Sequence, residues 1–210
     1  MAEDKRALLL DIALEQFAEH GYEKTSTNQI IQSAGISKGI LFHYFTSKKQ
    51  LYACVLDHGL ERIASYMERK ATDLPSELFG GILARSRVKM EFYMQEPSTY
   101  KLLVGAFAEP VPREVKDIVA ERRDRIARHL SDRSEQVDLS RARTGVDPAK
   151  ALDLATGVVS LLSHRFIERH RDRPDRGLSE VEPFLDEVRQ YLEMIEYGIY
   201  VPLNKEETEP

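Results

Sequence analysis

A short stretch near the N-terminus, SKGILFHYFTSKKQLY from Ser37 to Tyr52, combines side chains that could contact a nucleic acid. Hydroxyl, ammonium and imidazole groups can donate hydrogen bonds to phosphate oxygens or base edges, and glycine lets a backbone approach closely. Taken one at a time, these residues are explained better as helix caps and solvated lysines. The candidates for DNA contact are Ser26, Thr27, Ser37, Lys38, Gly39, His43, Tyr44, Lys48 and Lys49.

The distribution of charge around this stretch favours DNA as the partner. The chain of 210 residues carries a net charge of −5, which by itself argues against a polyanionic ligand. From Lys24 to Leu56, however, there is no aspartate or glutamate, and the segment contains four lysines. A contiguous window without acidic residues is an electrostatic footprint that can face phosphates.

Helix signals in the same window define the elements that would hold these side chains. Ser26 with Gln29, three residues later, predicts a capping box that opens a short helix, which Gly35 ends. Ser37 is a good N-cap for a second short helix over 38–44. Two short helices with a glycine at the turn have the length of a DNA-binding helix-turn-helix.

The second short helix is predicted to have one face toward the core and one face toward solvent. Ile40, Leu41 and Phe45 are predicted to face inward, whereas the small, basic or neutral residues at its start remain on the outer side. Gly39 inside a helix costs about 1 kcal/mol relative to alanine, which is easier to understand if the backbone must approach another molecule. After it, Ser47 with Gln50 predicts the start of a long helix from Lys48.

The run STNQIIQSAGISKGILFHYFTSKKQLYACVL, from Ser26 to Leu56, resembles the signature of TetR/AcrR-type transcriptional regulators. That signature usually contains A-G-V-S-x-G-x-L-Y-x-H-F-x-x-K-x-x-L, and the resemblance covers about residues 5–56. It implies an all-helical homodimer with an N-terminal DNA-binding domain and a variable C-terminal domain that binds an effector. The matching residues are Thr27, Ile30, Ala34, Gly35, Ser37, Gly39, Leu41, Phe45, Lys48 and Leu51.

This chain departs from the family signature at three neighbouring positions. Phe42 replaces the usual tyrosine and so removes a hydroxyl, and Tyr44 replaces the usual histidine, while His43 lies one position earlier. The phosphate and base contacts that the resemblance implies therefore carry over to Thr27, Lys38, Gly39 and Lys48 more directly than to the altered positions.

Two C-terminal helices are apolar over a wide surface. The segment ALDLATGVVSLLSHRFI contains two apolar stripes, and the last helix, for which Ser179 with Glu182 predicts a cap, has a 3-4 spacing typical of a coiled-coil seam. Both helices could simply close the chain's own core. We favour a four-helix dimer interface, which the resemblance also implies. The predicted interface residues are Leu152, Val158, Leu162, Phe166, Leu185, Val188, Leu192 and Ile195.

The middle helices are rich in methionine and aromatic residues, which could line a cavity for an apolar or amphipathic effector. For any single one of these residues, an ordinary core position is the stronger interpretation. Nothing in the sequence identifies the effector itself. The predicted pocket residues are Met90, Tyr93, Met94, Leu103, Phe107 and Val159.

Other features argue against further chemistry. The arginine runs at 121–133 and 165–177 interleave acidic residues and predict solvated helix faces. His164 and His170 lack the spacing of a metal site, and no enzyme motif is present, so we expect no metal, cofactor or catalytic residue. The single Cys54 and the absence of a signal sequence or a long apolar run indicate a cytoplasmic protein without a membrane segment.

The sequence as a whole predicts an all-α fold: an N-terminal three-helix helix-turn-helix DNA-binding domain (1–47), a helical effector-binding and dimerisation domain (48–203) and a frayed tail (204–210). The function it indicates is that of a ligand-responsive transcriptional regulator. We expect a repressor that binds a palindromic double-stranded DNA operator as a homodimer and is released by a small apolar or amphipathic molecule. The alternative is a helical scaffold for a protein partner, supported by the negative charge outside the acid-free window.

Overall fold

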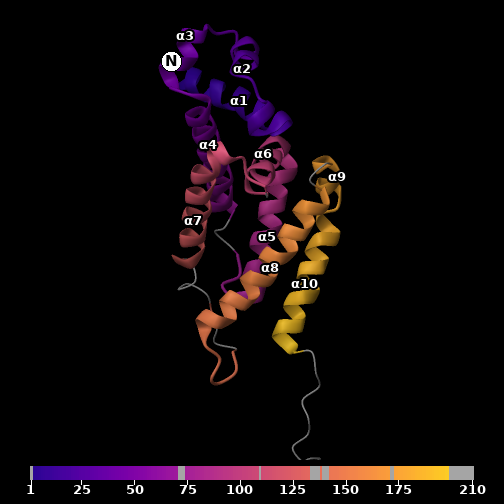
Figure 1. The fold of residues 1–210 in the computed structure, drawn as a ribbon. Helices are drawn as coiled ribbons and strands as arrows, with labels where there is room; N and C mark the ends of the chain where they lie inside the picture. The colour runs from indigo at the N-terminus through magenta and orange to yellow at the C-terminus, as the bar shows by residue number, and fades with distance from the viewer. Residues whose placement is uncertain are drawn as a thin grey trace, which may run out of the picture.

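In a computed structural model the chain forms a helical body with a small helical cap at one end (Figure 1). The structure describes residues 2–70, 74–108, 110–132, 138, 142–170 and 173–198. The predicted frayed tail, 204–210, lies outside the described residues. The predicted all-α fold is confirmed. Its elements are α1 (Ala2–Lys24), α2 (Thr27–Ala34), α3 (Lys38–Tyr44), α4 (Lys48–Lys70), α5 (Leu78–Gln95), α6 (Pro97–Phe107), the 3₁₀ turn η2 (Arg113–Val115), α7 (Lys116–Asp132), α8 (Pro148–His170), α9 (Pro174–Ser179) and α10 (Val181–Tyr197).

The cap consists of α1, α2 and α3, and its turns follow the predicted signals. Ser26 and Gln29 form the capping box of α2, and Gly35 ends that helix in the left-handed conformation with φ of 62°. Gly21 breaks the helical geometry near the end of α1 with φ of 67°. Glycine adopts these angles without the steric penalty of a Cβ atom, so the chain can turn sharply at both positions.

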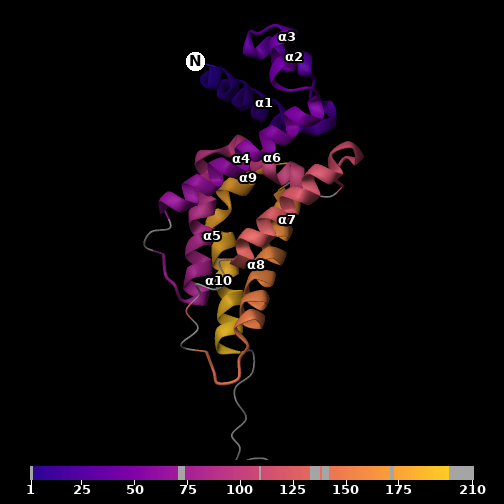
Figure 2. The same cartoon turned by 90° about the vertical axis from the view of Figure 1, so that its left-hand side faces the viewer.

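One apolar cluster joins the cap to the upper part of the body. It contains residues of α1 to α4 together with Leu102 and Leu103 of α6 and Val115, Ile118 and Val119 from η2 and α7. Helix α4 leaves the cap and runs into the body, so it belongs to both parts (Figures 1 and 2). Because the cluster is continuous, a movement of α6 or α7 can be transmitted to the cap through direct packing.

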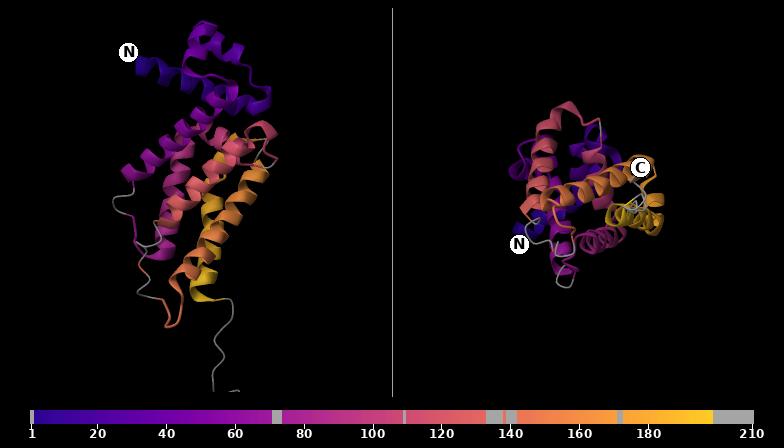
Figure 3. Two further views of the ribbon diagram at one scale, coloured as in Figure 1. Left: turned by 60° about the vertical axis from the view of Figure 1, so that its left-hand side comes forward. Right: turned by 90° about the horizontal axis from the view of Figure 1, so that it is seen from below.

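A second apolar cluster holds α5, α8 and α10 together in the lower body, where α8 and α10 lie side by side (Figure 3). Residues predicted for a dimer interface are part of it. The structure therefore corrects the prediction for five of them, which at 0–6% exposure belong to the chain's own core: Leu162, Phe166, Leu185, Val188 and Leu192. Leu152, Val158 and Ile195 pack at its edge and are partly exposed.

The large apolar residues that remain exposed on these two helices lie on other faces. They are Leu154 and Leu161 on α8 and Met194 and Tyr197 on α10. Leu154 and Leu161 belong to the other apolar stripe of α8. A seven-residue step returns a helix to nearly the same face, so the two leucines extend in line along the outside of α8.

Two further sequence predictions are corrected by the structure. Ser179 does not cap α10: its hydroxyl donates to the carbonyl of Arg176, and Glu180 occupies the N-cap position without a side-chain bond. Within the first arginine run, Arg122 is buried to 8% exposure rather than solvated. Its guanidinium donates to Asp57 of α4 at 2.6 Å, which ties α7 to α4.

Candidate nucleic-acid interface

Helix α3 is held by two buried side chains and exposes the rest of its surface. Leu41 and Phe45, four residues apart on one face, are each 1% exposed. Ile40, which the sequence analysis placed inward, is 44% exposed, so that prediction was wrong. Because successive helical residues lie about 100° apart, Ile40 cannot share the narrow inward face of a seven-residue helix anchored by Leu41.

The outward face of α3 has the composition that a groove-reading helix needs. Lys38, Gly39 and His43 are exposed, and Ser37 caps the helix by accepting a hydrogen bond from the Ile40 amide at 3.4 Å. Phe42, at 37% exposure, lies beneath the Lys38 ammonium, which is 5.8 Å from the centre of its ring. The face therefore presents one cation, one imidazole and apolar side chains of the kind that contact thymine methyl groups.

Gly39 has no internal reason to be glycine. A Cβ atom built at this position would meet only the Ser37 hydroxyl, at 3.8 Å, which is an ordinary contact. Glycine inside a helix is destabilising by about 1 kcal/mol relative to alanine. Neither the fold nor the backbone conformation explains this loss, whereas close approach of another molecule to the start of α3 would.

The three lysines predicted to contact DNA are in different situations. The Lys48 ammonium donates to the carbonyl of Glu23 at 3.2 Å and lies 4.6 Å from the centre of the Tyr22 ring. The Lys49 ammonium forms an ion pair with Asp117 of α7 at 2.9 Å. Lys38, within the part of the chain that the structure describes, has neither a hydrogen bond nor an ion pair, so it is the most available of the three for a phosphate or base.

The Lys49–Asp117 pair was not expected from the sequence. The hydrogen bond from Lys49 lowers the pKa of the Asp117 carboxyl despite the opposing effect of desolvation. The two residues are 68 positions apart, so no local pattern could have revealed the contact. As the structure stands, Lys49 links the start of α4 to α7 rather than extending toward a ligand.

Of the remaining predicted contact residues, Ser26 and Thr27 lie at the start of α2 and Tyr44 lies at the end of α3. Ser26 accepts a hydrogen bond from the Asn28 amide at 3.2 Å and is partly exposed, as is Thr27 beside it. Tyr44 is partly exposed and packs edge-on against His43, with 5.5 Å between ring centres. The structure thus brings the outward residues of α3 and the start of α2 to the same end of the molecule (Figure 1).

Three aromatic side chains pack together where the start of α4 meets α1. Tyr52 packs against both Phe17 and Tyr22, with 4.9 Å between ring centres in each case. Burial raises the pKa of Tyr52 to about 12. Tyr22, which contacts Lys48, is therefore part of a buried aromatic group that packs the start of α4 against α1.

The predicted effector-pocket residues are dispersed in the structure. Met90 belongs to the lower apolar cluster and Leu103 to the upper one, Phe107 and Val159 pack at cluster edges, and Met94 is 55% exposed. Tyr93 is different, because it packs against all three apolar clusters of the described structure, including the small one around Tyr66.

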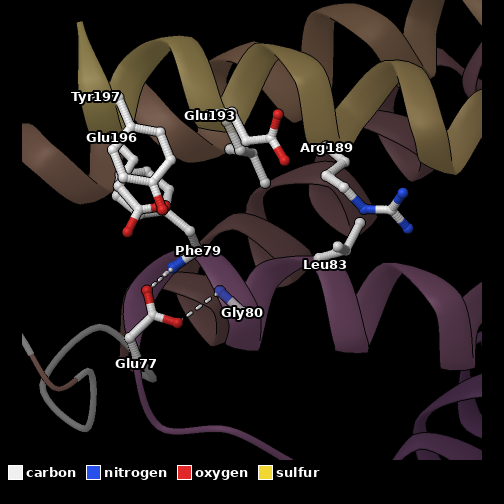
Figure 4. Close-up of a pocket in the computed structure, with 9 residues that line it drawn as sticks. Glu77, Phe79, Gly80, Leu83, Arg189, Glu193, Glu196 and Tyr197 are labelled. Carbon is white, nitrogen blue, oxygen red and sulfur yellow. Dashed lines mark hydrogen bonds between the residues drawn. The ribbon is translucent and has the colours of Figure 1, made fainter.

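Two open hollows lie elsewhere on the body. One, of about 290 Å³, lies between the start of α5 and the end of α10, with Phe79 and Tyr197 on its wall and Glu193 beside them (Figure 4). The other, of about 500 Å³, lies between α4 and α5, with His58, Arg62 and Phe92 among its lining residues. None of the six predicted pocket residues lines either hollow.

Among the described residues the structure shows neither a metal-binding group nor a membrane-spanning helix. No group of three histidine, cysteine, aspartate or glutamate side chains there could hold a metal ion. Buried His170 instead faces the Phe166 carbonyl and Glu180. None of the described helices combines the length and the apolar composition that spanning a bilayer requires.

Comparison with known proteins agrees with this geometry. Residues 9–55 match the family model described as bacterial regulatory proteins, tetR family. An HTH-type transcriptional repressor from Mycobacterium tuberculosis is 35% identical over 31% of this chain and 35% of its own length. The HTH-type transcriptional activator FasR from Mycolicibacterium smegmatis is 28% identical over 48% of this chain and 46% of its own. The chain thus spans less than half the length of these curated relatives.

Solved structures extend the likeness in fold to nearly the whole chain. A putative TetR-family regulator from Syntrophomonas wolfei matches 97% of this chain and 100% of its own with a TM-score of 0.69 at 17% identity. A TetR-like regulator from Rhodococcus sp. RHA1 matches 92% and 96% with a TM-score of 0.68 at 18% identity. The chain is thus similar to the tetR family over residues 9–55 and shares the fold of TetR-like structures, and the relatives named here are transcriptional regulators.

Proposed function

We propose that this chain is a TetR-type DNA-binding transcriptional regulator whose recognition helix is α3. The observation that carries the proposal is the outward face of that helix, where Lys38 has no ion pair among the described residues and Gly39 has no internal reason to be glycine. The acid-free window around this face removes the charges that would repel phosphates.

The regulator is proposed to act in the cytoplasm as a homodimer on a palindromic operator. The exposed apolar residues on α8 and α10, Leu154, Leu161, Met194 and Tyr197, support a protein contact that involves these two helices. Two α3 helices related by a two-fold axis can read half-sites in successive major grooves, roughly 34 Å apart. This revised surface replaces the buried residues that the sequence analysis assigned to the interface.

We propose that the regulator is a repressor released by a small effector bound in the body. The curated relatives include both a repressor and an activator, so the likeness to them does not by itself decide the direction of regulation. Release requires only a modest change in the spacing of the two recognition helices, because both must fit successive grooves at once.

A polar junction supports transmission from the body to the cap. Arg62 of α4 donates to Asp11 of α1 at 2.8 Å and to Glu96, at the start of α6, at 2.6 Å. His58 of α4 lies 2.8 Å from the same carboxylate oxygen of Asp11. One guanidinium thus connects the cap, the linking helix and the body, and a shift of α6 would change the position of α1.

The test is a gel-shift titration with the DNA upstream of the protein's own gene and a shuffled fragment of equal length, combined with light scattering. The proposal predicts a dimer that binds the upstream fragment at least roughly 10³-fold more tightly than the shuffled one. A monomer that binds both fragments equally weakly would contradict it and favour the scaffold alternative.

A further inference from the structure

Helix α3 offers few side chains that can read a base through hydrogen bonds. Its sequence, KGILFHY, contains no arginine, asparagine or glutamine, which are the residues that recognise guanine or adenine through paired hydrogen bonds. Lys38 and His43 are exposed and carry a polar group, whereas the exposed Gly39, Ile40 and Phe42 have no polar side-chain atom. If α3 is the helix that reads sequence, apolar contact must supply part of that reading.

Ile40 is the apolar side chain nearest the centre of the outward face. The inward direction of α3 lies between Leu41 and Phe45, which are each 1% exposed. Successive helical residues are about 100° apart, so the opposite direction falls at His43, with Ile40 roughly 60° to one side and Phe42 roughly 100° to the other. Ile40 is also the more exposed of the two apolar residues, at 44% against 37% for Phe42.

The neighbours of Ile40 leave its side of the helix open to a large molecule. The Lys38 ammonium lies 5.8 Å from the centre of the Phe42 ring, which places the cation on the other flank of α3. A Cβ atom at Gly39 would meet only the Ser37 hydroxyl, at 3.8 Å, so the backbone beside Ile40 is uncovered. The wall of a DNA groove can therefore come close to the isoleucine without displacing another side chain.

The base edge that suits an isoleucine is that of thymine. The 5-methyl group of thymine is the apolar group that base pairs present in the major groove, and apolar side chains recognise it by direct contact. Packed against another base edge, an isoleucine would leave hydrogen-bonding atoms of that base without a partner, which is unfavourable. An isoleucine on this face therefore favours thymine over the other bases without making a hydrogen bond.

We propose that Ile40 is a specificity-determining residue, whose side chain packs against the 5-methyl group of one thymine in each operator half-site. This inference rests on the proposed function and deepens it, because it names the chemical group that the recognition helix reads. The polar contacts of α3 are then left to Lys38 and His43, on the other parts of the exposed face.

The experiment removes the methyl group from the DNA and the side chain from the protein. Duplexes that the wild-type chain enriches from a random-sequence library are synthesised with deoxyuridine in place of thymidine, one symmetric pair of positions at a time. For the wild type, one such pair should weaken binding roughly 4-fold per half-site, or about 15-fold in all, which is the effect expected for one buried methyl group. For Ile40→Ala the same replacement should change the affinity by less than about 2-fold, because the contact is already lost.

A matched control is Val146→Ala, which truncates another exposed β-branched residue, just before α8, and should respond to deoxyuridine like the wild type. An enriched sequence in which every deoxyuridine replacement affects the wild type and Ile40→Ala alike would overturn this inference and leave the regulator standing. A library from which the wild-type chain enriches no sequence would contradict the regulator itself, and this inference with it.

Discussion

Helices α3 and α5 each present a lysine without an ion pair among the described residues, but in opposite environments. Lys38 lies in water on the outward face of the cap, beside a glycine and a histidine. Lys89 lies toward the interior of the body, where burial lowers its pKa. The first position is almost neutral for folding, and the second opposes it. The outward placement of Lys38 is understandable if this lysine binds a phosphate of DNA.

A third lysine shows what a satisfied cation looks like in the same molecule. Lys49 is bound to Asp117 and so ties α7 to the start of α4 rather than contributing to a ligand site. A lysine that the fold leaves without a partner is therefore a better indicator of a ligand site than the number of lysines in a segment.

The largest effect is expected from a change that breaks the inward anchor of α3. Leu41→Ala removes a side chain that is 1% exposed and should reduce the free energy of unfolding by about 2–5 kcal/mol. Ile40→Ala, at the neighbouring exposed position, should change it by less than about 0.5 kcal/mol. Urea denaturation of the two variants measures both values. Equal losses would mean that the two faces of α3 are not divided as described.

Removing the charge of Lys89 should raise the free energy of unfolding rather than lower it. Lys89→Met removes a desolvated charge and should raise the free energy of unfolding by about 1–3 kcal/mol. Lys38→Met, in water, should leave it within about 0.5 kcal/mol of the wild type. Differential scanning calorimetry of both variants makes the comparison. A destabilised Lys89→Met would show that Lys89 has an internal partner.

Replacing Gly39 by alanine should have opposite effects on the stability of the chain and on its binding to DNA. Gly39→Ala should stabilise the chain by about 1 kcal/mol, because alanine is the better helix former and a Cβ atom there meets nothing closer than 3.8 Å. The same change should weaken operator binding in a gel shift, since the added methyl group projects toward the DNA. If the variant were both more stable and equally tight, Gly39 would not mark the contact surface.

The smallest effect concerns the tie between α4 and α7. Although desolvation opposes it, hydrogen bonds from Arg122 and Arg125 lower the pKa of Asp57. A depressed carboxyl pKa stabilises the fold above the unfolded value of about 3.9 and ceases to do so as the pH falls through the folded value. Asp57 is 38% exposed, so Asp57→Asn should lose only about 0.5–1 kcal/mol at pH 7.

The pH dependence of that loss is its check. Urea denaturation of the wild type and Asp57→Asn should give stabilities that differ at pH 7 and converge as the pH falls through the lowered folded pKa of Asp57, where its carboxyl becomes uncharged. A difference that persisted unchanged in acid would mean that the ion pairs do not carry the effect.

The sequence was sufficient for the features that depend on neighbouring residues. The capping box of Ser26 and Gln29, the left-handed Gly35 and the cap at Ser37 were predicted because each is a local pattern with one structural solution. The likeness to the tetR family and the outward placement of Lys38 and Gly39 followed from the same short segment.

Features that depend on which face of a helix meets which neighbour could not be predicted. Helix α8 has two apolar stripes of similar strength, and the sequence alone did not show that Leu162 faces the core while Leu161 faces outward. The Lys49–Asp117 and Arg122–Asp57 pairs connect residues 65 or more positions apart. Lys89 was overlooked because a lysine in a helix is ordinarily solvated, and only the surrounding helices make it exceptional.

The most direct test of the regulator is the salt dependence of operator binding for the wild type, Lys38→Ala and the control Lys150→Ala. Each phosphate contact contributes about one to the slope of log affinity against log salt concentration. Lys38→Ala should weaken binding and reduce the slope by about one per bound protomer, while Lys150→Ala should leave both unchanged. An unchanged affinity and slope for Lys38→Ala would contradict the assignment of α3 as the helix that contacts DNA.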